Sequence, residues 1–137
     1  MKSVPIRAAC GLAAVAILAS GCAGSGMYSE PYALFEPEQK NVPADTRPAF
    51  VMKIDGANRA IDRNDPVKPG RREVEVSIPG PPGMSDPDRD TLAIDAKPCT
   101  RYFLAARRSS PTARDWKAFV ATTEPIRECT SQFAGAK

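Results

Sequence analysis

The chain contains no histidine and, in 137 residues, only one tryptophan and four cysteines. Without an imidazole there can be no Ser-His or Cys-His relay, so nucleophilic catalysis of the usual kind is not expected. Two carboxylates could still act as acid and base in a glycosidase, but nothing in the sequence brings a pair of them to one cleft. We therefore predict no enzyme activity and name no catalytic residue.

The sequence also lacks a long hydrophobic run and a strong excess of one charge. The apolar run 8–21 is shorter than the roughly 20 residues that a helix needs to cross a bilayer core. The formal net charge of +3 falls to about +1 when Lys2 and Arg7 are set aside with that run, which is too balanced for a nucleic-acid footprint. We expect no membrane-spanning helix and no nucleic-acid partner.

An export signal is present at the front of the chain. Lys2 and Arg7 precede the apolar run, and small residues close it at 18–22, Leu-Ala-Ser-Gly-Cys. This stretch resembles the lipobox of bacterial lipoproteins. The resemblance implies cleavage after Gly21 and a diacylglyceryl group on the sulfur of Cys22, and two or more acyl chains hold a protein firmly at a membrane. By the same resemblance Ala23 favours the outer membrane, so we predict a lipid-anchored protein of the cell envelope that faces the periplasm.

Two of the four cysteines are left for the mature domain. Cys10 leaves with the signal and Cys22 carries the lipid, so Cys99 and Cys129 remain. In an oxidising compartment an even pair is expected to form a disulfide, and a zinc site would need more ligands than these two. We predict the disulfide Cys99–Cys129, no metal and no cofactor.

An aspartate cluster has the spacing of the first ligands of a calcium loop. Its members are Asp86, Asp88 and Asp90. Such a loop requires Gly at its sixth position and Glu at its twelfth, where this chain has Thr91 and Lys97. We interpret the cluster as a solvated turn.

After the predicted signal peptide, residues 1–21, the chain divides into three parts. Residues 22–47 contain many Gly, Pro and Ser and no sustained apolar period, which predicts a lipidated flexible tether with a reach on the order of 25 to 30 Å. Residues 48–130 carry the strand patterns, and 131–137 are expected to be a disordered tail. The fold class expected is mainly β, a single small antiparallel β-sandwich after a signal peptide and a disordered tether.

An aromatic group within the tether is an exception to its composition. Its members are Tyr28, Tyr32, Leu34 and Phe35. They could lie at the membrane interface, dock on the domain or cluster locally, and the sequence does not choose among the three.

Period-two alternation predicts the strands. It is clearest at 72–78 and also present at 50–54 and 92–96, whereas 101–106 is apolar on both faces, as in a central strand. Residues 116–123 fit either a helix or a strand, and two adjacent threonines favour the strand. The residues expected to share a core face are Phe50, Met52, Ile54, Val74, Val76, Ile78, Leu92, Ile94 and Ala96. An antiparallel pair formed by the last two strands would bring Cys99 and Cys129 together at its open end.

The turns between these strands carry a resemblance. An Asp-Gly turn at 55–56, a Pro-Gly turn at 69–70 and an alternating strand at 73–76 resemble the PEGA-type module of bacterial surface proteins. This resemblance implies a small immunoglobulin-like or transthyretin-like β domain. The blocks 98–106 and 124–129 are similar to uncharacterised small proteobacterial lipoproteins, which implies no activity.

Two arginine doublets are the ligand-binding candidates. Arg71, Arg72, Arg107 and Arg108 could pair with phosphate or carboxylate groups of the envelope, because guanidinium binds such anions with two hydrogen bonds. The alternative is that they are solvated strand ends, where charge discourages edge-to-edge pairing.

Two functions are compatible with these features. The first is a non-enzymatic interaction or structural module that offers a sheet edge or a loop to another envelope protein. The second is a binding module for an envelope polyanion or glycan. A long exposed edge strand would favour the first function, and convergence of the four arginines on one concave surface would favour the second.

Overall fold

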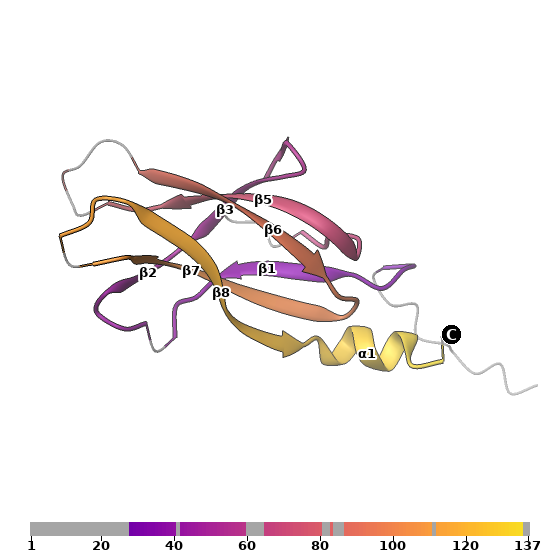
Figure 1. Cartoon of the computed structure of the whole chain (residues 1–137). Helices are drawn as coiled ribbons and strands as arrows, with labels where there is room; N and C mark the ends of the chain where they lie inside the picture. The colour runs from indigo at the N-terminus through magenta and orange to yellow at the C-terminus, as the bar shows by residue number, and fades with distance from the viewer. Residues whose placement is uncertain are drawn as a thin grey trace, which may run out of the picture.

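The computed structural model describes residues 28–40, 42–59, 65–80, 83, 87–110 and 112–135. Within these ranges the chain forms two β-sheets that pack face to face and one short helix, α1 (Figure 1). The prediction of a mainly β fold is confirmed. The prediction of purely antiparallel sheets is wrong, because one sheet contains a parallel pair.

The mixed sheet, called sheet A, is built around β7 (Thr100–Arg108). β8 (Trp116–Pro125) runs antiparallel along one side of β7. The other side is shared by two short strands that lie one after the other: β1 (Ala33–Pro37) is parallel to β7, and β2 (Thr46–Pro48) is antiparallel to it. The chain therefore leaves β7 at the end of β1 and returns in the opposite direction as β2.

The antiparallel sheet, called sheet B, has the strand order β4-β3-β5-β6. Its strands are β3 (Phe50–Ile54), β4 (Ala57–Asn58), β5 (Gly70–Ile78) and β6 (Asp88–Ala96). β3 and β4 form a hairpin whose turn residues, Asp55 and Gly56, have φ of 50° and 78°. An Asp-Gly pair tolerates this left-handed conformation, which is why the sequence predicts the turn.

The core lies between the two sheets. β5 places Val74, Val76 and Ile78 there at 0% exposure, so the predicted alternation of this strand is confirmed. Sheet A contributes mainly from β7. Other members of the core are Ala33, Phe35, Ala49, Ile54, Val67, Ile94, Ala96, Tyr102, Leu104, Ala106 and Trp116.

A bulge in β3 changes which of its residues face the core. Val51 pairs with Val76 and Lys53 with Glu75, so Met52 is an extra residue. Because a bulge shifts the side-chain alternation by one position, Val51 and Ile54 pack against the core. The prediction that Phe50 and Met52 share the core face with Ile54 is therefore wrong.

Hydrogen bonds join the two sheets along both sides of the core. On one side Ala33 of β1 and Val67, which precedes β5, exchange backbone hydrogen bonds of 2.8 and 2.9 Å. On the other side the backbone N–H of Ala118 in β8 donates to Oδ2 of Asp90 in β6 at 2.8 Å. The first half of the β8 edge is thus capped by a side chain from sheet B.

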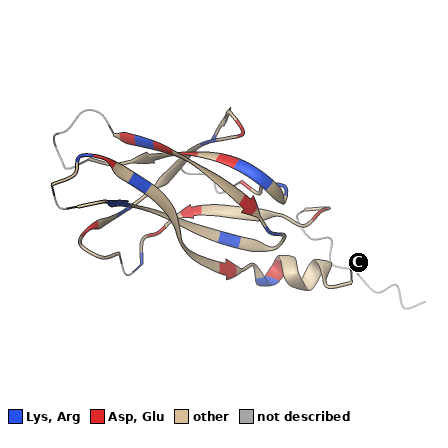
Figure 2. Ribbon diagram, viewed as in Figure 1, with Lys and Arg blue, Asp and Glu red and all other residues tan. Residues whose placement is uncertain are grey.

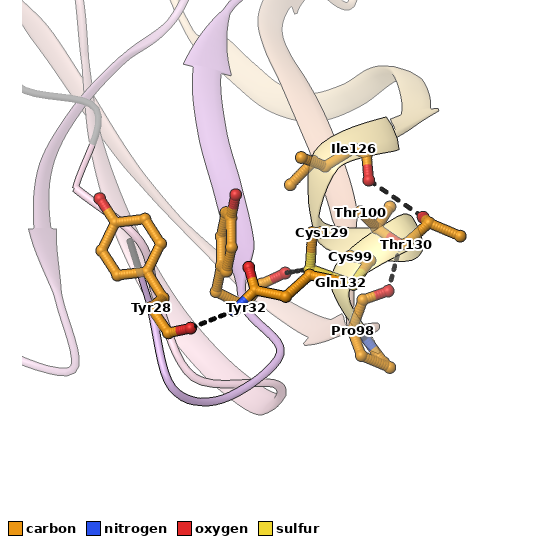
Figure 3. Close-up of a disulfide and its surroundings, with 9 residues drawn as sticks. All are labelled: Tyr28, Tyr32, Pro98, Cys99, Thr100, Ile126, Cys129, Thr130 and Gln132. Carbon is orange, nitrogen blue, oxygen red and sulfur yellow. Dashed lines mark hydrogen bonds between the residues drawn. A yellow bond between two sulfur atoms is a disulfide. The ribbon is translucent and has the colours of Figure 1, made fainter. Parts of the chain in front are cut away.

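A second apolar cluster lies beneath α1 (Arg127–Phe133). Leu34, Ile126 and Cys129 are buried there, and Cys99 is joined to Cys129 by a disulfide with a Cα–Cα distance of 5.2 Å (Figure 3). The backbone N–H of Ile126 donates to the carbonyl oxygen of Cys99 at 2.8 Å. The predicted disulfide is confirmed, and it closes the open end of the antiparallel β7–β8 pair as expected.

Part of the expected tether is folded. Residues 33–37 and 46–48, within 22–47, are strands, so the prediction of a flexible tether is wrong for them. The physical reason is that β1 is buried on both faces, with Ala33 and Phe35 in the core and Leu34 beneath α1. The aromatic group around β1 therefore docks on the domain.

The disordered tail expected at 131–137 is wrong for 131–133, because α1 continues to Phe133, whose side chain packs on the second cluster. The expected signal peptide, 1–21, with Cys10, and the following residues 22–27, with Cys22 and Ala23, lie outside the described residues.

Candidate functional site

The structure separates the two arginine doublets. Arg71 and Arg72 lie at the start of β5, opposite the end of β6, which is the disulfide end of the molecule. Arg107 and Arg108 end β7 at the opposite end, which we call the far end. The four arginines therefore do not converge on one surface.

Arg72 has a structural role at the disulfide end. Its guanidinium donates through Nη1 to Asp55 Oδ2 at 2.8 Å, through Nε to the Lys68 carbonyl at 2.8 Å and through Nη2 to the Pro69 carbonyl at 3.1 Å. These contacts tie the β3–β4 turn to the segment before β5. Arg71 is exposed beside its cross-strand neighbour Asp95.

The carboxylate of Asp55 is the second half of this arrangement. The backbone N–H of Glu73 donates to Oδ1 at 2.9 Å, and this hydrogen bond, together with the Arg72 guanidinium, lowers the pKa of Asp55 below its ordinary value of 3.8. Asp55 is therefore ionised at neutral pH and pairs with Arg72.

At the far end, arginines lie over aromatic rings. The guanidinium carbons of Arg47 in β2 and Arg108 in β7 are each 4.5 Å from the ring centroid of Trp116, the first residue of β8. Arg107 lies 4.9 Å from the ring centroid of Phe119. Strand register produces this cluster, because Arg108 is paired with Trp116 and Arg47 with Ala106, two residues earlier on β7.

These arginines line an open cavity of about 550 Å³. The residues around it are Ala44, Asp45, Arg47, Arg107, Arg108, Ser109, Ser110 and Trp116. They come from β2 and the segment before it, from the end of β7, from the β7–β8 loop and from the start of β8, so segments far apart in the sequence form one basic pocket. We call it the arginine pocket.

The charges of the arginine pocket are poorly neutralised. Among the described residues, no carboxylate forms an ion pair with Arg47, Arg107 or Arg108. Nη1 of Arg47 donates to the Pro79 carbonyl at 2.8 Å. Nε of Arg108, in contrast, is buried and has no hydrogen-bond partner among the residues that the structure describes. Basic segments of β2, β7 and β8 gather at this end, away from α1 (Figure 2).

The outer face of sheet A carries a shallow groove of about 340 Å³. Its floor is apolar, with Phe103 and Ala105 from β7 and Phe119 and Ala121 from β8. Its rim is charged, with Glu38, Lys40, Arg107 and Glu124. This groove runs beside the second half of β8.

That half of β8 is exposed because of a second bulge. Leu104 pairs with Val120 and Phe103 with Thr122, so Ala121 is the extra residue. Beyond it the strand diverges from β6, and Ala121–Pro125 are all exposed. In the described part of the chain, β8 pairs only with β7, and its outer edge carries no further strand.

No metal site is found. The described residues contain no group of three or more Cys, Asp or Glu side chains that could hold an ion. Asp86 lies outside these residues, Asp88 is exposed at the start of β6, and Asp90 accepts hydrogen bonds from the N–H groups of Thr91 and Ala118. None of the helices in the described ranges has the length and apolar character needed to cross a membrane.

Comparison with protein-family models, with curated proteins and with solved structures finds no match for this chain. The class that its own structure defines is a mainly β protein of two packed sheets with an internal disulfide. The resemblance to PEGA-type modules stays a prediction.

Sequence reasoning missed two parts of these surfaces. Arg47 is a single arginine next to a proline, and its aromatic partner, Trp116, lies far away in the sequence, so no local signal could have found the pair. The only sequence signal near the bulge at Ala121 is the pair of threonines that follows it. Both are β-branched and favour a strand, and the structure shows that both are exposed.

Proposed function

We propose that this chain is a lipid-anchored envelope protein, attached through Cys22 to the outer membrane and facing the periplasm. We propose further that it acts without catalysis, by accepting an extended segment of another envelope protein at the outer edge of β8. The observation that supports this most is the exposed second half of β8, Ala121–Pro125, beside the apolar groove of sheet A.

Strand addition suits this edge for two reasons. An unpaired strand edge offers N–H and C=O groups to an incoming segment, and the main-chain hydrogen bonds supply affinity. The groove supplies specificity, since every second side chain of the incoming strand would lie beside the groove residues of β8, Phe119, Thr122 and Glu124. Lys40 and Glu124 on the rim would select a partner with charges of both signs.

The proposed anchor places this edge near the membrane. Tyr28 is held against α1, because its carbonyl accepts a hydrogen bond from Nε2 of Gln132 (Figure 3). Six peptide steps separate Cys22 from Tyr28, and a fully extended chain of that length spans at most about 20 Å. The disulfide end, with Pro125 and α1, would therefore lie close to the lipid headgroups, because this link is shorter than the tether predicted from sequence.

The anchor is tested by changing the lipidated residue. Cys22→Ser should move the chain from the membrane fraction to the soluble fraction of lysed cells, and mass spectrometry of the wild-type chain should find acyl groups on Cys22. Continued sedimentation of the variant with membranes, or a bare Cys22 thiol with an uncut leader, would refute the anchor.

Strand addition is tested by crosslinking in intact cells. A photo-crosslinking residue in place of Thr123 should capture one reproducible protein, and the same residue in place of Thr91, an exposed threonine of sheet B, should not. Thr122→Lys should abolish the crosslink, because an ammonium group would then project over the groove, whereas Thr91→Lys should leave it unchanged. Equal crosslinking from both positions would contradict the proposed edge.

The alternative function, binding of an envelope polyanion or glycan through four arginines, is not supported in that form. Arg72 is fully engaged and Arg71 lies at the other end of the molecule from Arg107 and Arg108.

A further inference from the structure

We propose that the arginine pocket at the far end binds a phosphate group carried on a sugar. Three arginines contribute to this pocket, from β2 and from the end of β7, and two of them lie over the ring of Trp116, the first residue of β8. The inference goes beyond strand addition, which uses the edge of β8 at the disulfide end.

The first support is the uncompensated positive charge. Arg47 and Arg108 both lie 4.5 Å from the same indole ring, so their guanidinium carbons can be no further apart than twice that distance. Like charges at such a separation repel, and contact with an aromatic ring displaces part of their hydration. A bound anion would relieve this repulsion, because within the described ranges no carboxylate, including Asp45 of the cavity wall, forms an ion pair with either arginine.

The second support is preorganisation. The contacts with Trp116 restrain both guanidinium groups beside the cavity. Nη1 of Arg47 also donates to the Pro79 carbonyl, which leaves Nη2 of Arg47 and the terminal nitrogens of Arg108 as donors for a ligand. A carboxylate offers two oxygens and one charge, whereas a phosphate monoester offers three oxygens and a charge near −2 at neutral pH. Three arginine side chains therefore match a phosphate better than they match a carboxylate.

The third support is the remainder of the cavity. Its volume of about 550 Å³ exceeds what a phosphate group alone would fill. The rest of the wall is Asp45 with the hydroxyls of Ser109 and Ser110. A carboxylate in the wall disfavours a ligand that is anionic throughout, but it can accept hydrogen bonds from the hydroxyl groups of a sugar.

The direction in which the pocket faces favours a sugar over a lipid headgroup. If the proposed anchor on Cys22 holds, the disulfide end faces the membrane and the arginine pocket faces away from it, at the other end of the strands (Figure 1). A phosphate-bearing glycan can reach that end, whereas the headgroups of the anchoring membrane cannot.

Trp116 is the only tryptophan in the chain, so its fluorescence reports directly on the pocket. The full chain in mild detergent is titrated at about pH 7.5 with glucose 6-phosphate, glucose and glucuronate. We expect a saturable change with glucose 6-phosphate, weaker binding of glucuronate, no change with glucose, and loss of affinity as salt is raised. No saturable change with glucose 6-phosphate would overturn the proposal.

Arginine variants locate the binding. Arg47→Gln and Arg108→Gln should each weaken binding of glucose 6-phosphate about tenfold, because each removes charge-assisted hydrogen bonds. The matched control, Arg71→Gln, removes an exposed arginine at the disulfide end and should leave the affinity unchanged. Equal weakening by Arg71→Gln, or none by Arg47→Gln and Arg108→Gln, would overturn the proposal.

Two further arms complete the test. If Arg108→Gln lacks the circular dichroism of the wild-type fold, Arg108→Lys replaces it, because it keeps the charge but loses the planar donor pair and should still weaken binding. Vesicles of phosphatidylcholine with phosphatidic acid test the lipid source, and arginine-dependent binding to them without binding of glucose 6-phosphate would overturn the assignment to a sugar. Cys22→Ser and Thr122→Lys should bind glucose 6-phosphate like the wild type, so this result is independent of the anchor and of strand addition.

Discussion

The two ends of this molecule use their arginines in different ways. At the disulfide end Arg72 forms an ion pair with Asp55 and two hydrogen bonds to backbone carbonyls, and nearby Lys68 lies 3.4 Å from a carboxylate oxygen of Glu30. At the far end Arg47 and Arg108 lie on Trp116, and among the described residues they have no carboxylate partner. The arginine at the disulfide end connects segments within the chain, whereas we propose that the arginines at the far end bind a ligand.

The covalent structure follows the same division. The disulfide, α1 and the second apolar cluster all lie at one end, where they hold the N-terminal strand, the central strand and the last strand together. The described residues of the far end contain no disulfide, and there the two sheets are joined by hydrogen bonds from Arg47 to Pro79 and from Ala118 to Asp90. We therefore expect substitutions at the disulfide end to cost stability and substitutions at the far end to cost binding.

The largest effect is expected from removal of the disulfide. The double variant Cys99→Ser with Cys129→Ser should lower the free energy of unfolding by about 3 kcal/mol, because the bridge spans a sequence separation of 30 residues. Urea unfolding measures this loss, and wild-type protein treated with dithiothreitol should show the same shift. An unchanged unfolding midpoint in both samples would show that the disulfide does not stabilise the fold.

Next in size is Tyr102→Phe, also at the disulfide end. The buried hydroxyl accepts a hydrogen bond from the Lys97 N–H at 2.8 Å and donates to the Asp95 carbonyl at 3.3 Å. Its removal should cost about 1–2 kcal/mol in urea unfolding, while the ring keeps its stacking on Phe35. Tyr28→Phe is the matched control at the edge of the domain and should unfold like the wild type. If Tyr28→Phe lowered the free energy of unfolding more than Tyr102→Phe, the loss could not be assigned to the hydrogen bonds of the Tyr102 hydroxyl.

Smaller effects on stability are expected at the far end. Arg47→Gln and Arg108→Gln should each change the free energy of unfolding by less than about 1 kcal/mol, the usual size of an arginine-aromatic contact. The same urea experiment measures both variants, with Arg71→Gln as the control. A loss as large as that of the disulfide variant would mean that these arginines serve the fold and not a ligand.

The smallest effect concerns pH. The Glu73 N–H and Arg72 lower the pKa of Asp55 in the folded state. The ionised carboxylate therefore stabilises the fold at pH values above the unfolded pKa of 3.8, and this contribution is lost as the pH falls through the lower folded pKa. Asp55→Asn should therefore show a shallower loss of stability than the wild type when urea midpoints are compared from about pH 6 down to about pH 2. Parallel curves would show that the contact with Arg72 contributes nothing to folding.

The sequence predicts those strands whose side chains alternate without interruption. β5 and the core half of β6 have such patterns, and β7 is recognisable because both of its faces are apolar. The alternation fails where a bulge inserts a residue, as at Met52 and Ala121, because a bulge depends on the pairing with another strand. β1 was missed because its neighbours in the sequence are typical of a linker, and it is a strand only because β7 and α1 cover it.

The candidate surfaces are harder to predict than the strands. Arg107 and Arg108 could be named from sequence because they are adjacent, but Arg47 joins them only through the register of β2 on β7. The same reasoning grouped Arg71 and Arg72 with them, although strand direction places that doublet at the opposite end. Position along a strand can be inferred from a pattern, whereas the end of the sheet at which two strands meet depends on topology.

The parallel pairing of β1 with β7 has a mechanical consequence. Five consecutive residues of β1 are in register with β7, and the proposed anchor lies just before them in the chain. Suppose that the proposed glycan ligand held the far end while the lipid held the disulfide end. Tension would then run along the strand axis, and the hydrogen bonds between β1 and β7 would be sheared together instead of being broken one at a time. A short strand in this geometry resists a pull that would peel the end of a hairpin apart.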